Sequence, residues 1–240
     1  MSTAPVAGIE GRTAVVTGAA GGIGQAVVTA LEAAGATVHA WDLDTGGAGR
    51  RVDVTDRSAV ESAWQETEQQ DGQIDLLVHA AGVLSDDWDA CMAVNATGVR
   101  NVLDVAATAM STRRTGAAVV ISSNAGATPR ADMAAYAASK AAATSYTRSV
   151  ALAVASSGVR VNIVSPGSTD TSMLRSMWSS DADRETVIAG DPGRFRLGIP
   201  LRRIADPDDI AAAVVYLASD AARHVTMHDL RVDGGATLDM

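Results

Sequence analysis

Short, mostly apolar runs alternate with longer stretches of helical periodicity along the chain. The apolar runs cover residues 12–17, 36–41, 74–79, 117–122 and 159–164, and two shorter ones cover 50–52 and 229–232. Between them, helical patterns cover residues 22–34, 58–70, 92–111, 134–156 and 208–217. Apolar strands without polar alternation, each followed by a helix, are typical of a buried parallel sheet with helices on both faces. The pattern therefore predicts a doubly wound α/β fold, formed as a single domain over residues 1–240.

Residues 168–203 break this alternation. They are polar and irregular, and they contain Gly190, Pro192, Gly193, Gly198 and Pro200. A segment of this length without clear periodicity in a compact domain is usually a lid or a binding loop. Because it follows directly on the end of a predicted strand, where ligands bind in such folds, we interpret it as a substrate lid rather than a plain surface excursion.

Composition narrows the possible partners. The 28 acidic residues exceed the 19 basic ones, and the formal net charge of −9 argues against binding to nucleic acid or to an anionic membrane. Cys91 is the only cysteine, which excludes an intramolecular disulfide and fits a reducing cytoplasm. The four histidines lack the spacing of a zinc site, and no apolar run reaches the ~18 residues that span a bilayer. We therefore expect a cytoplasmic protein without a metal. Lys140 is the only lysine among the 19 basic residues, which raises the question of its role.

A glycine-rich turn joins the first predicted strand to the first predicted helix. Gly18, Gly22 and Gly24 permit positive φ and a close approach of the backbone, and the helix N-terminus presents free N–H groups to a pyrophosphate. Asp42, at the end of the next strand, is placed to accept hydrogen bonds from ribose hydroxyls and to repel a 2′-phosphate. This context predicts a Rossmann-type site that prefers NAD to NADP. Arg50 and Arg51 could hold a phosphate, but Asp42 makes that interpretation the less favoured one.

These residues carry a resemblance to the short-chain dehydrogenase/reductase family. Thr17–Gly24 resembles its TGxxxGIG pattern, and further family marks follow in order over essentially the whole chain: Asp53-Val54, Ala80-Ala81-Gly82, Asn95, Ser123, Tyr136-x-x-x-Lys140 and Pro166-Gly167. The resemblance implies that these marks, with Ile23, Asp42, Thr169 and Thr171, form the NAD site. Asp53 and Val54 would contact adenine, residues 80–82 would line the ribose side, and the two threonines would lie beside the nicotinamide carboxamide. It also implies a catalytic tetrad of Asn95, Ser123, Tyr136 and Lys140, and a homotetramer.

Tyr136 and Lys140 share one face of a predicted helix, because they are four residues apart. A phenol has a reference pKa of about 10, so a nearby ammonium and the positive charge of NAD⁺ would favour the phenolate that can act as a base. Ser123 can hold the substrate hydroxyl, and Asn95 can support a water that carries protons away from Lys140. The four residues predict hydride transfer between a carbinol carbon and nicotinamide.

Motifs in the second half of the chain resemble one branch of this family, and this resemblance limits the range of expected substrates. Thr128–Arg130, Val164–Thr171, Met173, Trp178 and Leu197–Leu201 are similar to a branch of the family that oxidises a ring hydroxyl of a cyclohexadiene carboxylate, of the 2,3-dihydro-2,3-dihydroxybenzoate type. The oxidised ring then tautomerises to an aromatic product, in siderophore or secondary-metabolite biosynthesis. A carboxylate needs a cationic partner, and Arg130 and Arg175 are the candidates.

Three features depart from this pattern or leave it open. His79 stands where the family usually has Asn, although an imidazole can also donate and accept hydrogen bonds. Only the twelve residues Val83–Val94 separate Gly82 from Asn95, so we expect an altered pocket wall. Asp132 either caps the following helix, which we favour, or accepts a hydrogen bond from a substrate ammonium. The second role would fit trans-2,3-dihydro-3-hydroxyanthranilate as the substrate and 3-hydroxyanthranilate as the product.

Two other functions share parts of this pattern. A 3-oxoacyl reductase of the same family would use NADP and usually has a basic residue near the position of Asp42. A non-catalytic NAD sensor would typically lack Tyr136 or Lys140, and this chain has both. We therefore expect an NAD-dependent dehydrogenase whose partner is a small cyclic carboxylate.

Overall fold

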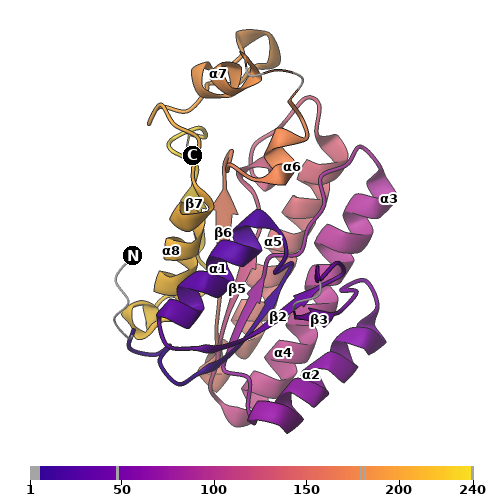
Figure 1. Cartoon of the computed structure of the whole chain (residues 1–240), viewed down its shortest axis with the longest axis vertical. Coiled ribbons are helices and arrows are strands. Elements are labelled where there is room, and N and C mark those ends of the chain that lie inside the picture. The colour runs from indigo at the N-terminus through magenta and orange to yellow at the C-terminus, as the bar shows by residue number, and fades with distance from the viewer. Residues whose placement is uncertain (1–5, 47–48, 179, 181, 239–240) are drawn as a thin grey trace.

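Seven parallel strands form one sheet in the order β3-β2-β1-β4-β5-β6-β7. The computed structural model describes residues 6–46, 49–178, 180 and 182–238, and the strand bounds that follow refer to them. The strands are β1 (Thr13–Thr17), β2 (Thr37–Asp42), β3 (Arg50–Arg51), β4 (Leu76–His79), β5 (Ala117–Ile121), β6 (Arg160–Pro166) and β7 (Asp229–Val232). Each predicted strand is therefore present, and the prediction of a doubly wound, Rossmann-type α/β fold is confirmed (Figure 1).

Five long helices cover the two faces of the sheet (Figure 1). They are α1 (Gly22–Ala33), α2 (Arg57–Asp71), α4 (Val99–Arg113), α5 (Ala134–Val154) and α8 (Pro207–Ala218). Helices α1 and α8 pack together on one face, and α2, α4 and α5 cover the other. The sequence of β1 is apolar without alternation because both faces of this strand are buried. Ala14 and Val16 pack in the core that includes α1 and α8, whereas Val15 packs in the core that includes α2, α4 and α5.

The helix expected over residues 92–111 is interrupted. The short helix α3 (Trp88–Cys91) precedes a π-helical segment, Met92–Gly98, and α4 begins only at Val99. A π-helical turn inserts an extra residue into the backbone ladder, and such turns often occur at functional sites. Asn95 lies within this segment, and its side chain is tied to the backbone of Val83. This long-range contact has no signature in the local periodicity, which is why the sequence pattern missed the interruption.

The segment 168–203 is more ordered than its sequence pattern indicates, although residues 179 and 181 lie outside the described part. It contains the helices α6 (Ser172–Arg175) and α7 (Ala182–Ala189), followed by a 3₁₀ turn at Pro192–Arg194. Leu174, Ile188 and Ile199 of this segment form a small apolar core with Ile204, which follows it. Figure 1 shows α6 and α7 beyond the ends of the strands, where a lid would lie. None of the helices in the described ranges combines the length and apolar character needed to cross a membrane.

Candidate active site

A cavity of about 380 Å³ opens at the carboxyl ends of the central strands. Ala80 and Gly82 follow β4, Ser123 follows β5, and residues 166–169 end or follow β6; all of them line the cavity. Segments from α6 to residue 199 close its outer side. The strand order reverses between β1 and β4, and ligands bind at such a switch point in open α/β sheets.

The glycine-rich turn brings the start of α1 to the same edge of the sheet. Gly18 has a φ of +67°, and a Cβ there would lie 2.4 Å from the backbone nitrogen of Ala81. A Cβ on Gly24 would lie 2.0 Å from the carbonyl oxygen of Gly18. Within the described residues, the N–H groups of residues 22–24 have no hydrogen-bond acceptor. This cradle of packed glycine and free N–H groups fits a pyrophosphate, as the sequence predicts.

Asp42 is held against the glycine-rich turn. One of its carboxylate oxygens accepts a hydrogen bond from the N–H of Ala20 at 2.9 Å, and the other accepts one from Asp44 at 3.0 Å. Its carboxylate is thus fixed near the start of α1, where a ribose hydroxyl could reach it. Arg50 forms an ion pair with Glu66, which removes one of the two arginines that could have favoured a 2′-phosphate.

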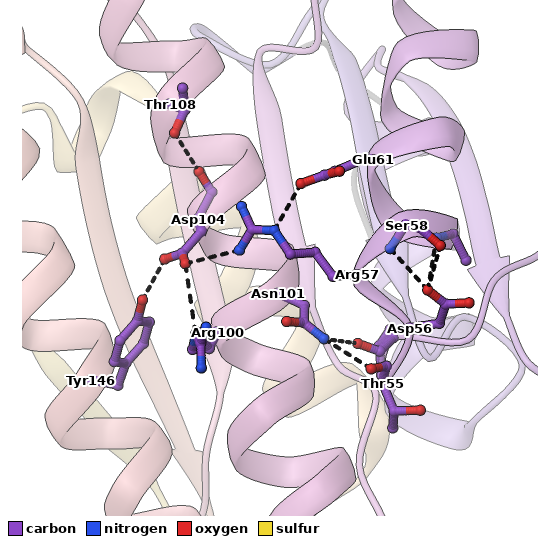
Figure 2. Close-up of polar contacts among 12 residues, drawn as sticks. Thr55, Asp56, Arg57, Ser58, Glu61, Arg100, Asn101, Asp104, Thr108 and Tyr146 are labelled. Atoms are coloured by element: carbon purple, nitrogen blue, oxygen red, sulfur yellow. Dashed lines mark hydrogen bonds and ion pairs between the residues drawn. The ribbon is translucent and has the colours of Figure 1, made fainter.

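The predicted adenine contacts lie beyond β3 and outside the cavity. The Asp53 carboxylate accepts hydrogen bonds from the backbone and hydroxyl of Thr55, at 2.9 and 2.7 Å. The Asn101 side chain on α4 donates to the carbonyl oxygens of Val54 and Thr55, at 3.0 and 3.1 Å (Figure 2). These bonds fix the loop that would face the adenine.

Three of the four predicted catalytic residues meet in the cavity: Ser123, Tyr136 and Lys140. The Lys140 Nζ donates to the carbonyl oxygen of Ile121 at 3.0 Å and lies 5.9 Å from the centroid of the Tyr136 ring. Burial lowers the pKa of Lys140 to about 8. Burial also raises the pKa of Tyr136, against the smaller opposing effect of its hydrogen bond with Ser123. Desolvation of Tyr136 thus favours the neutral phenol in the protein alone, and the expected phenolate, which also depends on the charge of bound NAD⁺, stays a prediction.

Asn95, the fourth predicted residue, is fully buried and has a structural role in this arrangement. Its amide nitrogen donates to the carbonyl oxygen of Val83 at 2.9 Å and to the Ser139 hydroxyl at 3.0 Å, while its oxygen accepts from the Val83 N–H at 2.9 Å. The side chain thus fastens the short loop 83–94 to α5. A Cβ on Gly82 would lie 3.1 Å from the Asn95 Oδ1 and 3.2 Å from the Lys140 Nζ, so only a residue as small as glycine fits there without displacing them.

His79 ties β4 to β1 beneath the cavity. Its Nδ1 lies 2.9 Å from the Thr17 hydroxyl, so the strand-linking role expected of the imidazole is present. Burial lowers the pKa of His79 to about 3, with a smaller contribution from the charge of Lys140. The ring is therefore neutral at neutral pH.

The two arginines predicted to bind a carboxylate lie in different places. Arg130 lines the cavity and is half-buried. Arg175 does not line it: its side chain is 62% exposed and forms an ion pair with Asp170 at 2.7 Å. The structure therefore does not bring Arg175 to the cavity, because α6 directs this side chain to the surface, and its role in substrate binding stays a prediction. The cavity instead receives Arg194 and Arg196 from the segment after α7, which sequence reasoning missed.

Asp132 does not cap α5. Met133 occupies the N-cap position, without a side-chain capping bond, and the Asp132 carboxylate pairs with Arg194 at 3.2 Å. The favoured capping role is thus wrong. Much of the remaining lining is apolar, with Met133, Met173, Leu174, Met177, Trp178 and Val187, and it also includes Asp183, Thr186 and Asp191. This lining can exclude water from a ring-shaped substrate. Within the described ranges, no group of three or more His, Cys, Asp or Glu side chains is arranged to hold a metal ion.

Comparisons with known proteins agree with this geometry. Residues 18–237 match a family model described as enoyl-(acyl carrier protein) reductase. A 2,3-dihydro-2,3-dihydroxybenzoate dehydrogenase of Bacillus subtilis is 43% identical over an alignment of 255 positions, and the match covers 96% of this chain and 98% of the relative. A vibriobactin-specific 2,3-dihydro-2,3-dihydroxybenzoate dehydrogenase of Vibrio cholerae is 40% identical over an alignment of 250 positions, and the match covers 94% of this chain and 95% of the relative. A solved structure described as gox2181 superimposes with a TM-score of 0.85 at 32% identity, covering 94% of this chain and 95% of that one.

Proposed function

Since the chain belongs to the short-chain dehydrogenase/reductase family, we propose that it oxidises a ring hydroxyl of 2,3-dihydro-2,3-dihydroxybenzoate, or a very similar cyclohexadiene carboxylate, with NAD⁺. One observation carries the proposal. A single cavity joins Ser123, Tyr136 and Lys140 to a half-buried arginine, Arg130, that forms no ion pair within the described residues. A hydroxyl and a carboxylate on one ring would satisfy the two ends of this cavity.

The residues of the chain act on the reacting hydroxyl. Ser123 holds its oxygen, and Tyr136 accepts its proton while the carbinol C–H leaves as a hydride. Lys140 stabilises the phenolate form of Tyr136, and Asn95 holds the loop that borders both. Bound NAD⁺ supplies the hydride acceptor and a positive charge that offsets the effect of burial on Tyr136. The resulting dienone tautomerises to an aromatic ring, which makes the oxidation effectively one-way.

The residues at the start of α1 and at the end of β2 fit NAD better than NADP. The glycine cradle and the N–H groups of residues 22–24 would hold the pyrophosphate, and Asp42 would hold the adenosine ribose. Ala80, Ala81 and Gly82 would line the ribose side, and Pro166, Gly167, Thr169 and Thr171 would border the nicotinamide. A 2′-phosphate would meet the Asp42 carboxylate. The same observation disfavours a 3-oxoacyl reductase that uses NADP.

The ion pair of Asp132 bears on the choice of substrate. A substrate ammonium would need this carboxylate, which Arg194 already neutralises. We therefore favour the dihydroxy substrate over trans-2,3-dihydro-3-hydroxyanthranilate. A cytoplasmic homotetramer with a role in siderophore or secondary-metabolite biosynthesis completes the proposal; the tetramer rests on family analogy and on the alanine-rich α4 and α5.

Side-by-side kinetics test the proposal. The formation of NADH, followed at 340 nm, is measured with the dihydroxy and the amino-hydroxy cyclohexadiene carboxylates, and each is repeated with NADP⁺. We expect the highest kcat/KM with the dihydroxy compound and NAD⁺, and an aromatic product. A higher kcat/KM with the amino compound would replace the substrate assignment, and no turnover of either would overturn it.

A further inference from the structure

Two guanidinium groups converge on one end of the cavity from segments distant in sequence. Arg130 lies in the loop between β5 and α5, and Arg196 lies after α7. Both line the cavity and both are half-buried. Two cations placed together in a protein with a net charge of −9 need an explanation.

Neither of these guanidinium groups has a carboxylate partner within the described residues. The Arg196 Nη2 contacts the sulfur of Met133 at 3.7 Å. Burial lowers the pKa of Arg130, and repulsion by Arg196 adds to this effect. Asp233 attracts Arg130, but its carboxylate already accepts hydrogen bonds from Asn124, Thr237 and Gly235.

The neighbouring arginine shows the contrast. Arg194, two residues before Arg196, pairs with Asp132 at 3.2 Å and with Asp191 at 3.6 Å. Acidic side chains are therefore within reach of this loop, yet they pair with Arg194, and neither Arg196 nor Arg130 forms an ion pair with any residue that the structure describes. An unneutralised pair of half-buried guanidinium groups is a site for an anion, because each can bind a carboxylate through two parallel hydrogen bonds.

The backbone fixes the position of Arg196. Asp191 and Arg196 exchange two backbone hydrogen bonds, at 3.0 and 2.9 Å, across a tight loop. Gly190 and Gly198 close the base of this loop with φ values of +92° and +79°, and a Cβ on Gly198 would lie 2.6 Å from the backbone nitrogen of Gly190. A side chain on a backbone held in this way loses less conformational entropy when it binds a ligand.

We propose that Arg130 and Arg196 together bind the ring carboxylate of the substrate, and that Arg196 determines the specificity for a carboxylated ring. This inference rests on the proposed function and deepens it. The apolar residues hold the ring, the two guanidinium groups hold its carboxylate, and the ring hydroxyl is thereby directed toward Ser123 and Tyr136.

Kinetics with two substrates test the role of Arg196. The first substrate is the dihydroxycyclohexadiene carboxylate, and the second is the cyclohexadiene diol without the carboxylate. Arg196→Gln should raise KM for the first by roughly 10- to 100-fold, the range expected for one lost charged hydrogen-bonding partner, and should change neither kcat nor the kinetics of the second. Arg196→Lys keeps the positive charge but loses the planar guanidinium group, so its KM for the carboxylated substrate should lie between those of the unaltered protein and Arg196→Gln. Arg148→Gln is the matched control and should change KM by less than about 3-fold, because this exposed arginine of α5 lies outside the cavity and pairs with Asp229 at 3.3 Å.

A binding measurement separates failure of this inference from failure of the proposed function. Calorimetric titration of the protein with 2,3-dihydroxybenzoate and with catechol should show tighter binding of the carboxylate, and Arg196→Gln should abolish that difference. Discrimination in binding without turnover of the carboxylated substrate would overturn the proposed function and keep the anion site. Turnover with an unchanged KM in Arg196→Gln and Arg196→Lys would overturn the anion site and keep the function.

Discussion

The nucleotide end of the proposed site consists mainly of backbone groups, whereas the substrate end consists mainly of side chains. At the nucleotide end, backbone N–H groups, packed glycines and one carboxylate lie on a strand-to-helix turn and on the next strand. At the substrate end, side chains from two distant segments meet: Ser123, Arg130 and Tyr136 lie between the end of β5 and the start of α5, and Arg196 follows α7. Backbone contacts recognise a group common to many reactions, whereas side chains can be exchanged without disturbing the sheet. The difference explains how one fold retains a cofactor while its substrate changes.

Removal of the reactive phenol should have the largest effect on turnover. We predict that Tyr136→Phe lowers kcat by about 10²- to 10⁴-fold, the usual contribution of a positioned acid–base group. NAD binding, measured by titration, should be unchanged, which would show that the two ends are separable. Tyr216→Phe, at an exposed tyrosine on α8, is the control and should keep full activity. Retained activity in Tyr136→Phe would contradict the assignment of the base.

A methyl group in the cradle should disrupt the nucleotide end. Gly18→Ala places a Cβ 2.4 Å from the Ala81 nitrogen at a positive φ, so we expect the free energy of unfolding to fall by roughly 2–4 kcal/mol and NAD binding to weaken. Gly11→Ala is the matched control, since Gly11 also has a positive φ, of +71°, but nothing lies within 4 Å. It should show only the conformational cost of about 1–2 kcal/mol. If thermal unfolding shows the same loss of stability in Gly18→Ala and Gly11→Ala, the close approach of Gly18 to Ala81 does not contribute to the effect.

Acid should lower the free energy of unfolding through His79, which links β4 to β1. The pKa of this histidine is about 3 in the folded protein and about 6.5 when it is unfolded. Between these values only the unfolded state binds the proton, so stability is full above pH ~6.5 and falls by about 1.4 kcal/mol per pH unit as the pH drops. Denaturant unfolding at several pH values should show that His79→Asn has a shallower dependence in this range. The same slope in both proteins would exclude His79 as the cause.

Cofactor choice offers a smaller test at the nucleotide end. Asp42→Asn removes the charge but keeps an oxygen that can accept from Ala20. We expect kcat/KM with NADP⁺ to rise relative to NAD⁺ by about 10-fold, equivalent to ~1.4 kcal/mol of relieved repulsion. Asp44→Asn, at a neighbouring acid, should leave the ratio unchanged. If the ratio stays constant in Asp42→Asn as well, another group must select the nucleotide.

The smallest effect is expected at Arg175. This side chain pairs with Asp170 outside the cavity, so Arg175→Ala should change kcat/KM by less than about 2-fold. A large increase in KM for the carboxylated substrate, measured beside Arg196→Gln, would show that α6 moves during catalysis and brings Arg175 to the ligand.

The sequence by itself determined the parts that depend on neighbours in the chain. Apolar periodicity predicted the seven strands of the described residues, and the spacing of Tyr136 and Lys140 placed both side chains on one face of α5, where they line the cavity. Each signal reflects short-range physics: the pleat of a strand or the turn of a helix.

Only the tertiary structure decided the parts that depend on how distant segments meet. It placed Arg196 beside Arg130 and sent Arg175 to the surface. It also paired Asp132 with Arg194, and it buried Tyr136 so that its pKa rises. Contacts across irregular segments and the desolvation of a buried group arise from the complete path of the chain, and no local pattern of residues records them.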